Sequence, residues 1–149
     1  MKFIAFDTAT QCGIAYRDEY GDWHTDVLDP YSVCVADAIR NARDIWGITA
    51  AILEGCYLGK NAHTFGKLSE IQGRIKLLCE QAGLSPIVVY QPSEWQASFG
   101  ISAKNGGNTK DGSRVTAIRL GAAKGLSADE YDAICLCDYA ESMAKLEGE

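Results

Sequence analysis

The chain has 149 residues, of which 47% are hydrophobic, and a formal net charge of −6, which at first argues against a nucleic-acid-binding protein. The length fits a single core, so we expect residues 1–149 to form one domain. No stretch reaches the ~18 apolar residues of a membrane helix, and the N-terminus lacks the long apolar region and cleavage site of a secretory signal, so we expect a cytoplasmic protein with no membrane partner.

The first third of the chain predicts three strands and a helix. The strands are short apolar or alternating runs joined by tight turns, which favours an antiparallel meander. The helix has apolar side chains every three or four residues and ends before Gly47. We expect the strands at residues 2–6, 12–16 and 22–28, and the helix at residues 31–46.

The rest of the chain alternates strands and helices. An apolar, β-branched run leads into Glu54 and predicts a central parallel strand. A long helix is expected over residues 61–82, with Asn61 as its N-cap, and Ser127 caps the last helix through a capping box. Between them we expect a strand at 86–90, a short helix from Pro92, a basic loop at 100–112 and a helix from Ser113 to about Lys124.

This order of elements predicts the fold class. Three antiparallel strands followed by strand–helix alternation give a five-stranded mixed sheet with helices on both faces. RNase H-like proteins share this order of elements. We therefore predict an α/β protein with an RNase H-like fold.

Charge is distributed unevenly along the chain. Residues 57–78 carry four basic and one acidic side chain, and residues 101–126 carry five basic and one acidic. The segments around them are acidic. Acids can hold metal cations and neighbouring bases can hold phosphates, so the pattern suits a metal-dependent enzyme acting on phosphates. An unevenly charged surface without such a function gives the same pattern.

The six cysteines do not indicate a zinc site. None forms a Cys-x-x-Cys pair, and neither His24 nor His63 lies near a cysteine cluster. Most of the cysteines stand in apolar stretches, which predicts buried, reduced thiols in a reducing compartment. They are Cys12, Cys34, Cys56, Cys79, Cys135 and Cys137.

Four carboxylates carry the candidate chemistry. Asp7 and Glu54 end two strands that are neighbours in the expected sheet, so both should emerge at one edge. Asp129 and Asp132 stand one turn apart on one face of the last helix. Taken singly, each is explained equally well as a strand-end or helix-cap acid. Together they could bind two hard cations about 4 Å apart, which can promote in-line phosphoryl displacement.

With these four acids, the chain resembles the RuvC-type Holliday junction resolvases. That family has an Asp on the first strand, a Glu on the fourth and Asp-x-x-Asp in the last helix, matched here by Asp7, Glu54 and Asp129–Asp132. The family also has an aromatic residue three positions after the Glu, followed by Lys-Asn at the start of the long helix. Tyr57, Lys60 and Asn61 match that segment. The resemblance extends from Lys2 to about Met143.

The resemblance implies a homodimeric crossover junction endodeoxyribonuclease of DNA recombination and repair. Dimers would form through the helix at 61–82, and each active site would use two Mg²⁺ ions, with Mn²⁺ as a substitute. Asp7, Glu54, Asp129 and Asp132 would be the catalytic metal ligands. Cleavage of branched DNA, especially four-way junctions, would leave a 5′-phosphate and a 3′-hydroxyl. The expected DNA contacts are Tyr57, Lys60, Asn61, Lys104, Lys110 and Arg114.

The chain also departs from the family pattern. Bacterial relatives have a lysine at the start of the third helix, where this sequence has Trp95. A further family lysine precedes the fourth helix, and here Lys104, Lys110 and Arg114 are candidates, of which we favour Lys110. These departures predict a divergent, phage-type member with broader activity on branched DNA, in a bacterial or phage-infected cell.

Three alternatives remain open from the sequence. Asp7-Thr8-Ala9-Thr10 followed by Gly13 resembles the phosphate-binding hairpin of the actin-like ATPase superfamily, one branch of which serves tRNA modification. That hypothesis does not explain Asp129 and Asp132, and 149 residues leave little room for a nucleotide cleft. The second alternative is a junction-binding protein without catalysis, and the third is an enzyme acting on RNA–DNA hybrids.

Overall fold

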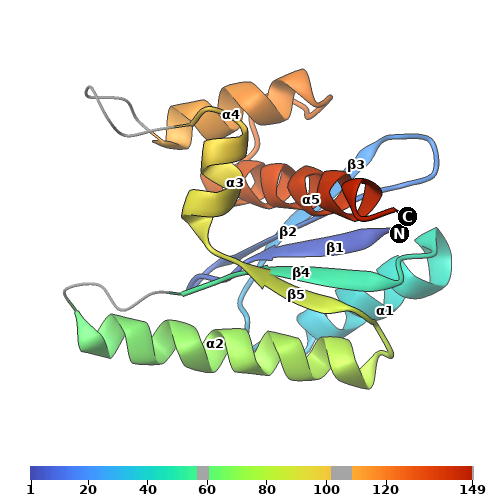
Figure 1. Cartoon of the computed structure of the whole chain (residues 1–149). Coiled ribbons are helices and arrows are strands. Elements are labelled where there is room, and N and C mark those ends of the chain that lie inside the picture. Colours follow the sequence, from blue (N-terminus) through green and yellow to red (C-terminus); the bar gives the residue numbers. More distant parts are fainter. Residues whose placement is uncertain (57–60, 102–108, 149) are drawn as a thin grey trace.

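The computed structural model describes residues 1–56, 61–101 and 109–148, which contain a five-stranded sheet with helices on both faces (Figure 1). The strand order is β3-β2-β1-β4-β5. The β3–β2 and β2–β1 pairs are antiparallel, whereas β1–β4 and β4–β5 are parallel. The predicted mixed α/β sheet is confirmed. Its strands are β1 (Phe3–Asp7), β2 (Cys12–Arg17), β3 (Trp23–Leu28), β4 (Ala50–Glu54) and β5 (Ile87–Tyr90).

The helices cover the two faces of the sheet in two layers (Figure 1). One layer contains α1 (Cys34–Trp46) and α2 (Ala62–Gln81), and the other contains α3 (Pro92–Ser98), α4 (Thr109–Arg119) and α5 (Ala128–Leu146). Within the described ranges, no helix is both long and apolar enough to cross a lipid bilayer.

The pleat of the central strands divides the core in two. Successive side chains of a strand point to opposite faces, so alternate residues of β1 enter different cores. Phe3 and Ala5 pack with α5, whereas Ile4 and Phe6 pack with α1 and α2. Both faces of β1 are therefore buried, which explains its continuous apolar run. By the same alternation, Asp7 follows Phe3 and Ala5 onto the α5 face.

Three predicted helix boundaries are confirmed. Gly47 ends α1 in the left-handed conformation. The Asn61 side chain accepts hydrogen bonds from the backbone N–H groups of His63 and Thr64, which makes it the N-cap of α2. Ser127 and Glu130 form the predicted capping box at the start of α5.

The predicted start of the first helix at Tyr31 is wrong, because α1 begins at Cys34. The Asp29 carboxylate accepts a hydrogen bond from the Tyr31 N–H, and the Asp29 carbonyl accepts one from Ser32. This side-chain-stabilised turn competes locally with the helix. The apolar spacing from Val35 onward therefore indicates the start of α1 better than the residues before Val35 do.

The predicted range of the fourth helix is also wrong. Ser113 does not cap it, because α4 already begins at Thr109, inside the segment expected to be a basic loop. Ser113 is a buried interior residue whose carbonyl accepts a bond from the Cys135 thiol. The helix ends at Arg119 rather than near Lys124, because Gly121 has φ of +100° and the Ala122 N–H bonds back to the Ala117 carbonyl.

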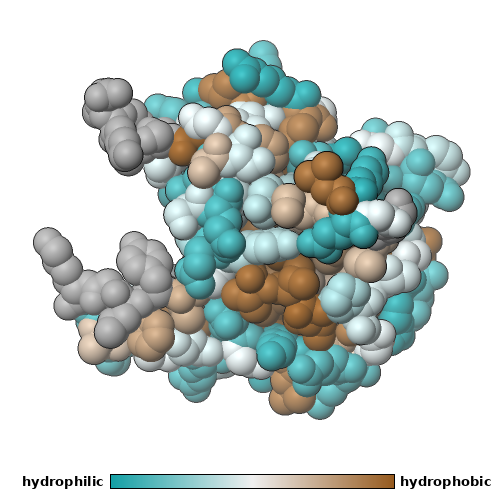
Figure 2. Space-filling view, in the orientation of Figure 1, coloured by the Kyte–Doolittle hydropathy of each residue, from teal (hydrophilic) through white to brown (hydrophobic). Residues whose placement is uncertain are grey.

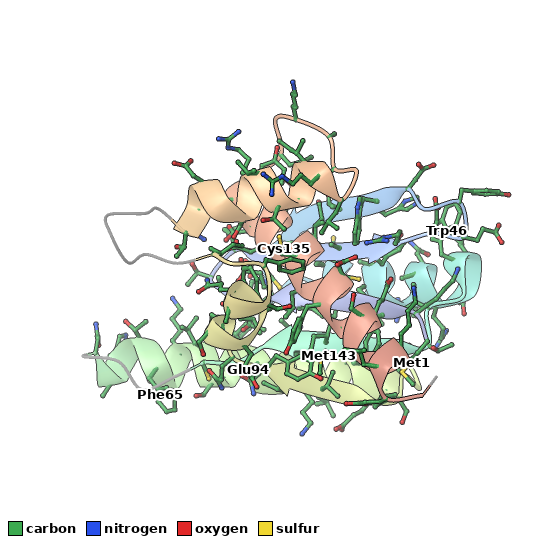
Figure 3. The ribbon with its side chains drawn as sticks, turned by 45° about the horizontal axis from the view of Figure 1, so that its top comes forward. Met1, Trp46, Phe65, Glu94, Cys135 and Met143 are labelled. Atoms are coloured by element: carbon green, nitrogen blue, oxygen red, sulfur yellow. The ribbon has the colours of Figure 1, made fainter. Side chains whose placement is uncertain are left out.

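The cysteines are free and mostly buried, as predicted: Cys12, Cys79, Cys135 and Cys137 are buried, and Cys56 is half-buried. Cys34, at the start of α1, is exposed instead. Cys135, labelled in Figure 3, lies on the side of α5 that packs against α4. The thiols therefore act as small apolar groups of the core.

The outer edge of β5 forms an apolar part of the surface. Figure 2 shows apolar side chains gathered over β5, with polar residues around them. Val89 of this strand is 38% exposed, and a hollow beside it is lined by Phe3, Pro86 and Val88. β5 is the edge strand of the sheet on the side away from the antiparallel strands, so this apolar surface lies along a sheet edge.

Two glycine substitutions should change stability in opposite directions. Gly121→Ala should lower the free energy of unfolding by about 1 kcal/mol, because an L side chain is strained at this positive φ. Gly73→Ala, in the interior of α2 with open space for a Cβ, should raise it by about 0.5–1 kcal/mol. Chemical denaturation measures both, and equal shifts in the same direction would contradict the assigned backbone conformations.

Candidate active site

The ends of β1 and β4 bring Asp7 and Glu54 together. Phe6 pairs with Leu53 in the parallel ladder, so the next residue of each strand stands at the same edge of the sheet. The Thr8 hydroxyl donates a hydrogen bond of 2.6 Å to the Glu54 carbonyl and ties the two strand ends. Asp7 is only 6% exposed. The pairing of β1 with β4 therefore places Asp7 and Glu54 side by side, as the sequence predicted.

The first turns of α5 supply Asp129 and Asp132 over the same edge. Asp132 is 7% exposed, and one of its carboxylate oxygens lies 2.8 Å from the Lys110 ammonium nitrogen. Gly13, which pairs with Asp7 in β2, packs directly against the backbone of Asp129. The helix start is thus held close to the end of β1.

The four carboxyl groups share one electrostatic environment. Burial raises the pKa of Asp7 well above its ordinary value, and the negative charges of Glu54, Asp132 and Asp129 raise it further. Burial also raises the pKa of Glu54, as does the charge of Asp132, while a hydrogen bond with Asp7 and the charge of Lys110 act in the opposite direction. Such coupling requires that the groups lie close together.

Lys110 is the cation of this cluster. Burial alone would lower its pKa, but the hydrogen bond to Asp132 and the charges of Asp7 and Asp129 outweigh burial and raise it. Lys110 stands in the first turn of α4, which begins at Thr109 rather than at Ser113, where the sequence predicted its start. The choice of Lys110 among the candidate bases remains a prediction about function, but its side chain does reach the acidic cluster.

The donor set suits a hard divalent cation. Carboxylate oxygens are the ligands that Mg²⁺ and Mn²⁺ prefer, and one buried oxygen of Glu54 has no hydrogen-bond partner within the described residues. As the side chains lie, no three acidic, His or Cys groups of the described ranges form a closed metal-binding cluster. One oxygen of Asp132 is paired with Lys110 instead.

The predicted DNA contacts are only partly within the described residues. Tyr57, Lys60 and Lys104 lie outside them. Asn61 uses its side-chain oxygen to cap α2. Arg114 is exposed on α4, with a guanidinium nitrogen 3.9 Å from an oxygen of Asp111, one turn earlier.

Trp95 occupies the interior rather than the site surface. It is 1% exposed and packs in the core formed with α5. The tryptophan at the position of the family lysine therefore fills space between α3 and α5. Thr8 and Gly13, which the sequence analysis considered only as part of an ATPase-like hairpin, contact the acidic cluster directly.

Comparison with known proteins identifies the fold. No family model and no curated protein matches the sequence. The chain is similar to Thermus thermophilus RuvC in complex with a Holliday junction substrate, at a TM-score of 0.76 and 13% identity over 99% of this chain and 97% of that one. A second T. thermophilus RuvC structure has a TM-score of 0.71 with the same identity and coverage. The yeast mitochondrial Holliday junction resolvase Ydc2 has a TM-score of 0.60 and 9% identity over 97% and 80%.

These matches confirm the resemblance at the level of the fold. The structure is a RuvC-like variant of the RNase H-like fold, as the order of elements predicted. Identities of 13% and below establish the shared architecture and leave the chemistry to be argued from the residues themselves.

Removing one buried carboxyl should stabilise the metal-free protein. The folded pKa of Asp7 lies above its unfolded value, so ionisation costs stability as the pH rises above about 4. At pH 7 with a chelator, Asp7→Asn should raise the free energy of unfolding by about 1 kcal/mol or more, which is about 3 °C in Tm. The difference in the free energy of unfolding between Asp7→Asn and the wild type should shrink as the pH is lowered toward 4.

The exposed turn residue Asp22 provides the control for this measurement, because Asp22→Asn should leave Tm nearly unchanged. Adding Mg²⁺ or Mn²⁺ should then raise Tm more for the wild type than for Asp7→Asn. Asp7→Asn that destabilises the metal-free protein would show that no repulsive cluster exists at this edge.

Proposed function

We propose that this protein is a metal-dependent endonuclease that cuts branched DNA, with four-way junctions as its main substrate. The observation that carries the proposal is that β1, β4 and α5 bring four carboxyl groups to one edge of the sheet, where Asp7 and Asp132 are buried. The fold is that of proteins described as Holliday junction resolvases, one of them in complex with its junction substrate. The similarity of the fold suggests a nuclease of branched DNA, and the acidic cluster provides groups that could bind the metal ions that such a nuclease needs.

The four carboxylates would hold two Mg²⁺ ions, or Mn²⁺ in their place. Two such ions supply activation of a water molecule and stabilisation of the leaving oxygen in phosphodiester hydrolysis. Asp7 and Glu54 come from paired strands, which fixes their separation, while Asp129 and Asp132 come from α5. Lys110 stands where it can partly balance their charge and contact a phosphate. We expect 5′-phosphate and 3′-hydroxyl products.

Basic residues near this edge would hold the DNA backbone. Lys110 and Arg114 lie one turn apart at the start of α4, so both can approach the same strand. Asn61 caps the start of α2, where backbone N–H groups favour an anion. Tyr57, Lys60 and Lys104 complete the set of proposed contacts, in the two basic segments of an acidic chain.

A homodimer formed through α2 would place two such sites on one junction. The helix covers one side of the sheet and runs along the surface of the molecule (Figure 1). Leu77 on this helix is 52% exposed and offers apolar surface to a second copy. Its burial in a second copy would remove that apolar surface from water.

The central experiment is a cleavage assay on a synthetic four-way junction. With Mg²⁺ or Mn²⁺, the wild type should cut opposing strands, whereas Asp7→Asn or Glu54→Gln should slow cutting by more than about 100-fold, because metal-held charge stabilises the transition state by several kcal/mol. Junction binding should remain, measured by gel shift. Asp22→Asn should cut normally.

The same assay separates the alternatives. Duplex, fork and RNA–DNA hybrid substrates run in parallel show whether the enzyme prefers junctions, and binding without cleavage would support a junction-binding protein instead. Wild-type protein that binds no branched DNA at low salt would refute the proposal. The actin-like ATPase hypothesis is not favoured, since Thr8 of the supposed phosphate-binding hairpin is buried and bonded to the Glu54 carbonyl.

The dimer can be tested separately by sedimentation. Leu77→Glu should weaken self-association by about 10-fold or more, because it replaces an apolar contact worth about 1.5–3 kcal/mol with a charge. Ile45→Glu, at a 64% exposed position of α1, is the matched control and should leave self-association unchanged. A wild type that remains monomeric at tens of micromolar would contradict the proposed interface.

A further inference from the structure

Two of the four site carboxylates depend on where α5 begins. Asp129 and Asp132 stand in its first turns, and the first turn of a helix has backbone N–H groups without partners inside the helix. Such ends fray unless other groups hold them. Asp7 and Glu54, by contrast, are fixed by the parallel ladder between β1 and β4.

The β2–β3 hairpin contacts this first turn directly, although it carries none of the four carboxylates. A Cβ built on Gly13 would lie 2.2 Å from the backbone oxygen of Asp129, so only glycine fits there. Gly13 is the partner of Asp7 in the antiparallel ladder. The missing side chain therefore lets the start of α5 approach the end of β1.

Thr25 makes the second contact. This residue of β3 donates a hydrogen bond of 2.5 Å from its hydroxyl to one oxygen of Glu130. The other oxygen of Glu130 accepts a bond of 3.0 Å from the Ser127 N–H, within the capping box. Glu130 lies between Asp129 and Asp132 in sequence, so the bond from Thr25 acts on the same helical turn.

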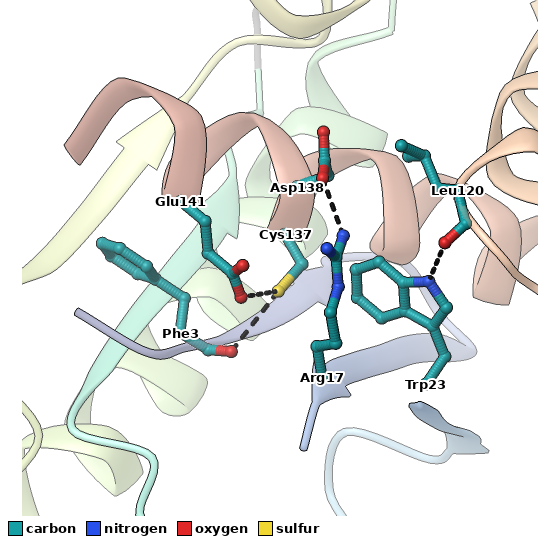
Figure 4. A network of polar contacts seen from close by, with 7 residues as sticks. All are labelled: Phe3, Arg17, Trp23, Leu120, Cys137, Asp138 and Glu141. Carbon is teal, nitrogen blue, oxygen red and sulfur yellow. Dashed lines mark hydrogen bonds and ion pairs between the residues drawn. The ribbon is translucent and has the colours of Figure 1, made fainter. Parts of the chain in front are cut away.

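The hairpin also holds α5 further along its length. Figure 4 shows the Arg17 guanidinium paired with Asp138 of α5, and the Trp23 indole bonded to the Leu120 carbonyl in the segment after α4. The nitrogen–oxygen distance between Arg17 and Asp138 is 2.7 Å. The Arg17 guanidinium also lies over the Trp23 ring. The Arg17–Asp138 pair therefore holds the middle of α5, whereas the Thr25–Glu130 bond and the Gly13 contact act on its first turn.

We propose that Thr25 is a positioning residue, whose bond to Glu130 sets the orientation of Asp129 and Asp132 for divalent metal binding. This inference rests on the proposed metal site. Thr25 neither binds the metal nor touches substrate; it acts through Glu130 on the turn between the two ligands. Groups that orient metal ligands from behind affect metal affinity strongly, even when the fold is intact.

The test compares three full-length variants by calorimetric titration with Mn²⁺. Thr25→Val removes the donor but keeps the shape and the strand preference, and should weaken Mn²⁺ binding by about 10-fold. Thr25→Ser restores the hydroxyl and should bind Mn²⁺ nearly as the wild type does. Thr49→Val is the matched control, because Thr49 is exposed at the opposite end of β4 from Glu54.

Hydrogen exchange provides a readout independent of the metal. Amides of residues 129–132 should exchange faster in Thr25→Val than in the wild type, while those of β1 and β4 should not change. Junction cleavage by Thr25→Val should recover at saturating Mn²⁺, which a general loss of stability would not produce.

The outcomes separate the two proposals. Wild-type protein that binds Mn²⁺, together with a Thr25→Val variant that binds it equally well, would overturn the positioning role and leave the metal site standing. A wild type that binds no Mn²⁺ would overturn the metal site and the positioning role with it.

Discussion

The burial of carboxyl groups that repel one another when charged is the constraint around which this end of the molecule is organised. Asp7 and Glu54 cannot move apart, because they end two hydrogen-bonded parallel strands. Burial raises the pKa of both, and the charge of Asp132, which approaches from α5, raises it further. A protein keeps such an arrangement only if packing elsewhere holds it, and the two apolar cores on either side of the sheet do so. A divalent cation would turn the repulsion into attraction.

The two halves of the sheet position the four acids in different ways. The parallel strands β1 and β4 carry Asp7 and Glu54, whereas the antiparallel hairpin of β2 and β3 holds the helix that carries the other two acids. Gly13 contributes by having no side chain, and Thr25 by a single hydroxyl. A change at either would act on the site without touching its carboxylates.

Much of the fold could be predicted from the sequence because the local signals agree. The strand runs lie within one or two residues of the observed strands, and the Asn61 cap and the Ser127 capping box stand at the boundaries that the structure shows. The starts of α1 and α4 could not be predicted in this way, since each lies beside side-chain contacts that local spacing does not indicate. The turn at Asp29 includes a side-chain hydrogen bond that competes with the helix, and the first turn of α4 contains Lys110, whose partner Asp132 is distant in sequence. Gly121 was a visible stop signal that outweighs the helical pattern beyond it.

The sequence by itself determined the α/β order of elements and the four acids at strand ends and on one helix face. Residue type and spacing suffice for that, since both are local properties. Only the tertiary structure decided that these acids share one buried field, that Lys110 enters it, that Trp95 belongs to the core, and that Thr25 and Gly13 hold α5. These facts depend on contacts between residues far apart in sequence, such as Thr25 and Glu130 at 105 positions, and no local pattern encodes them.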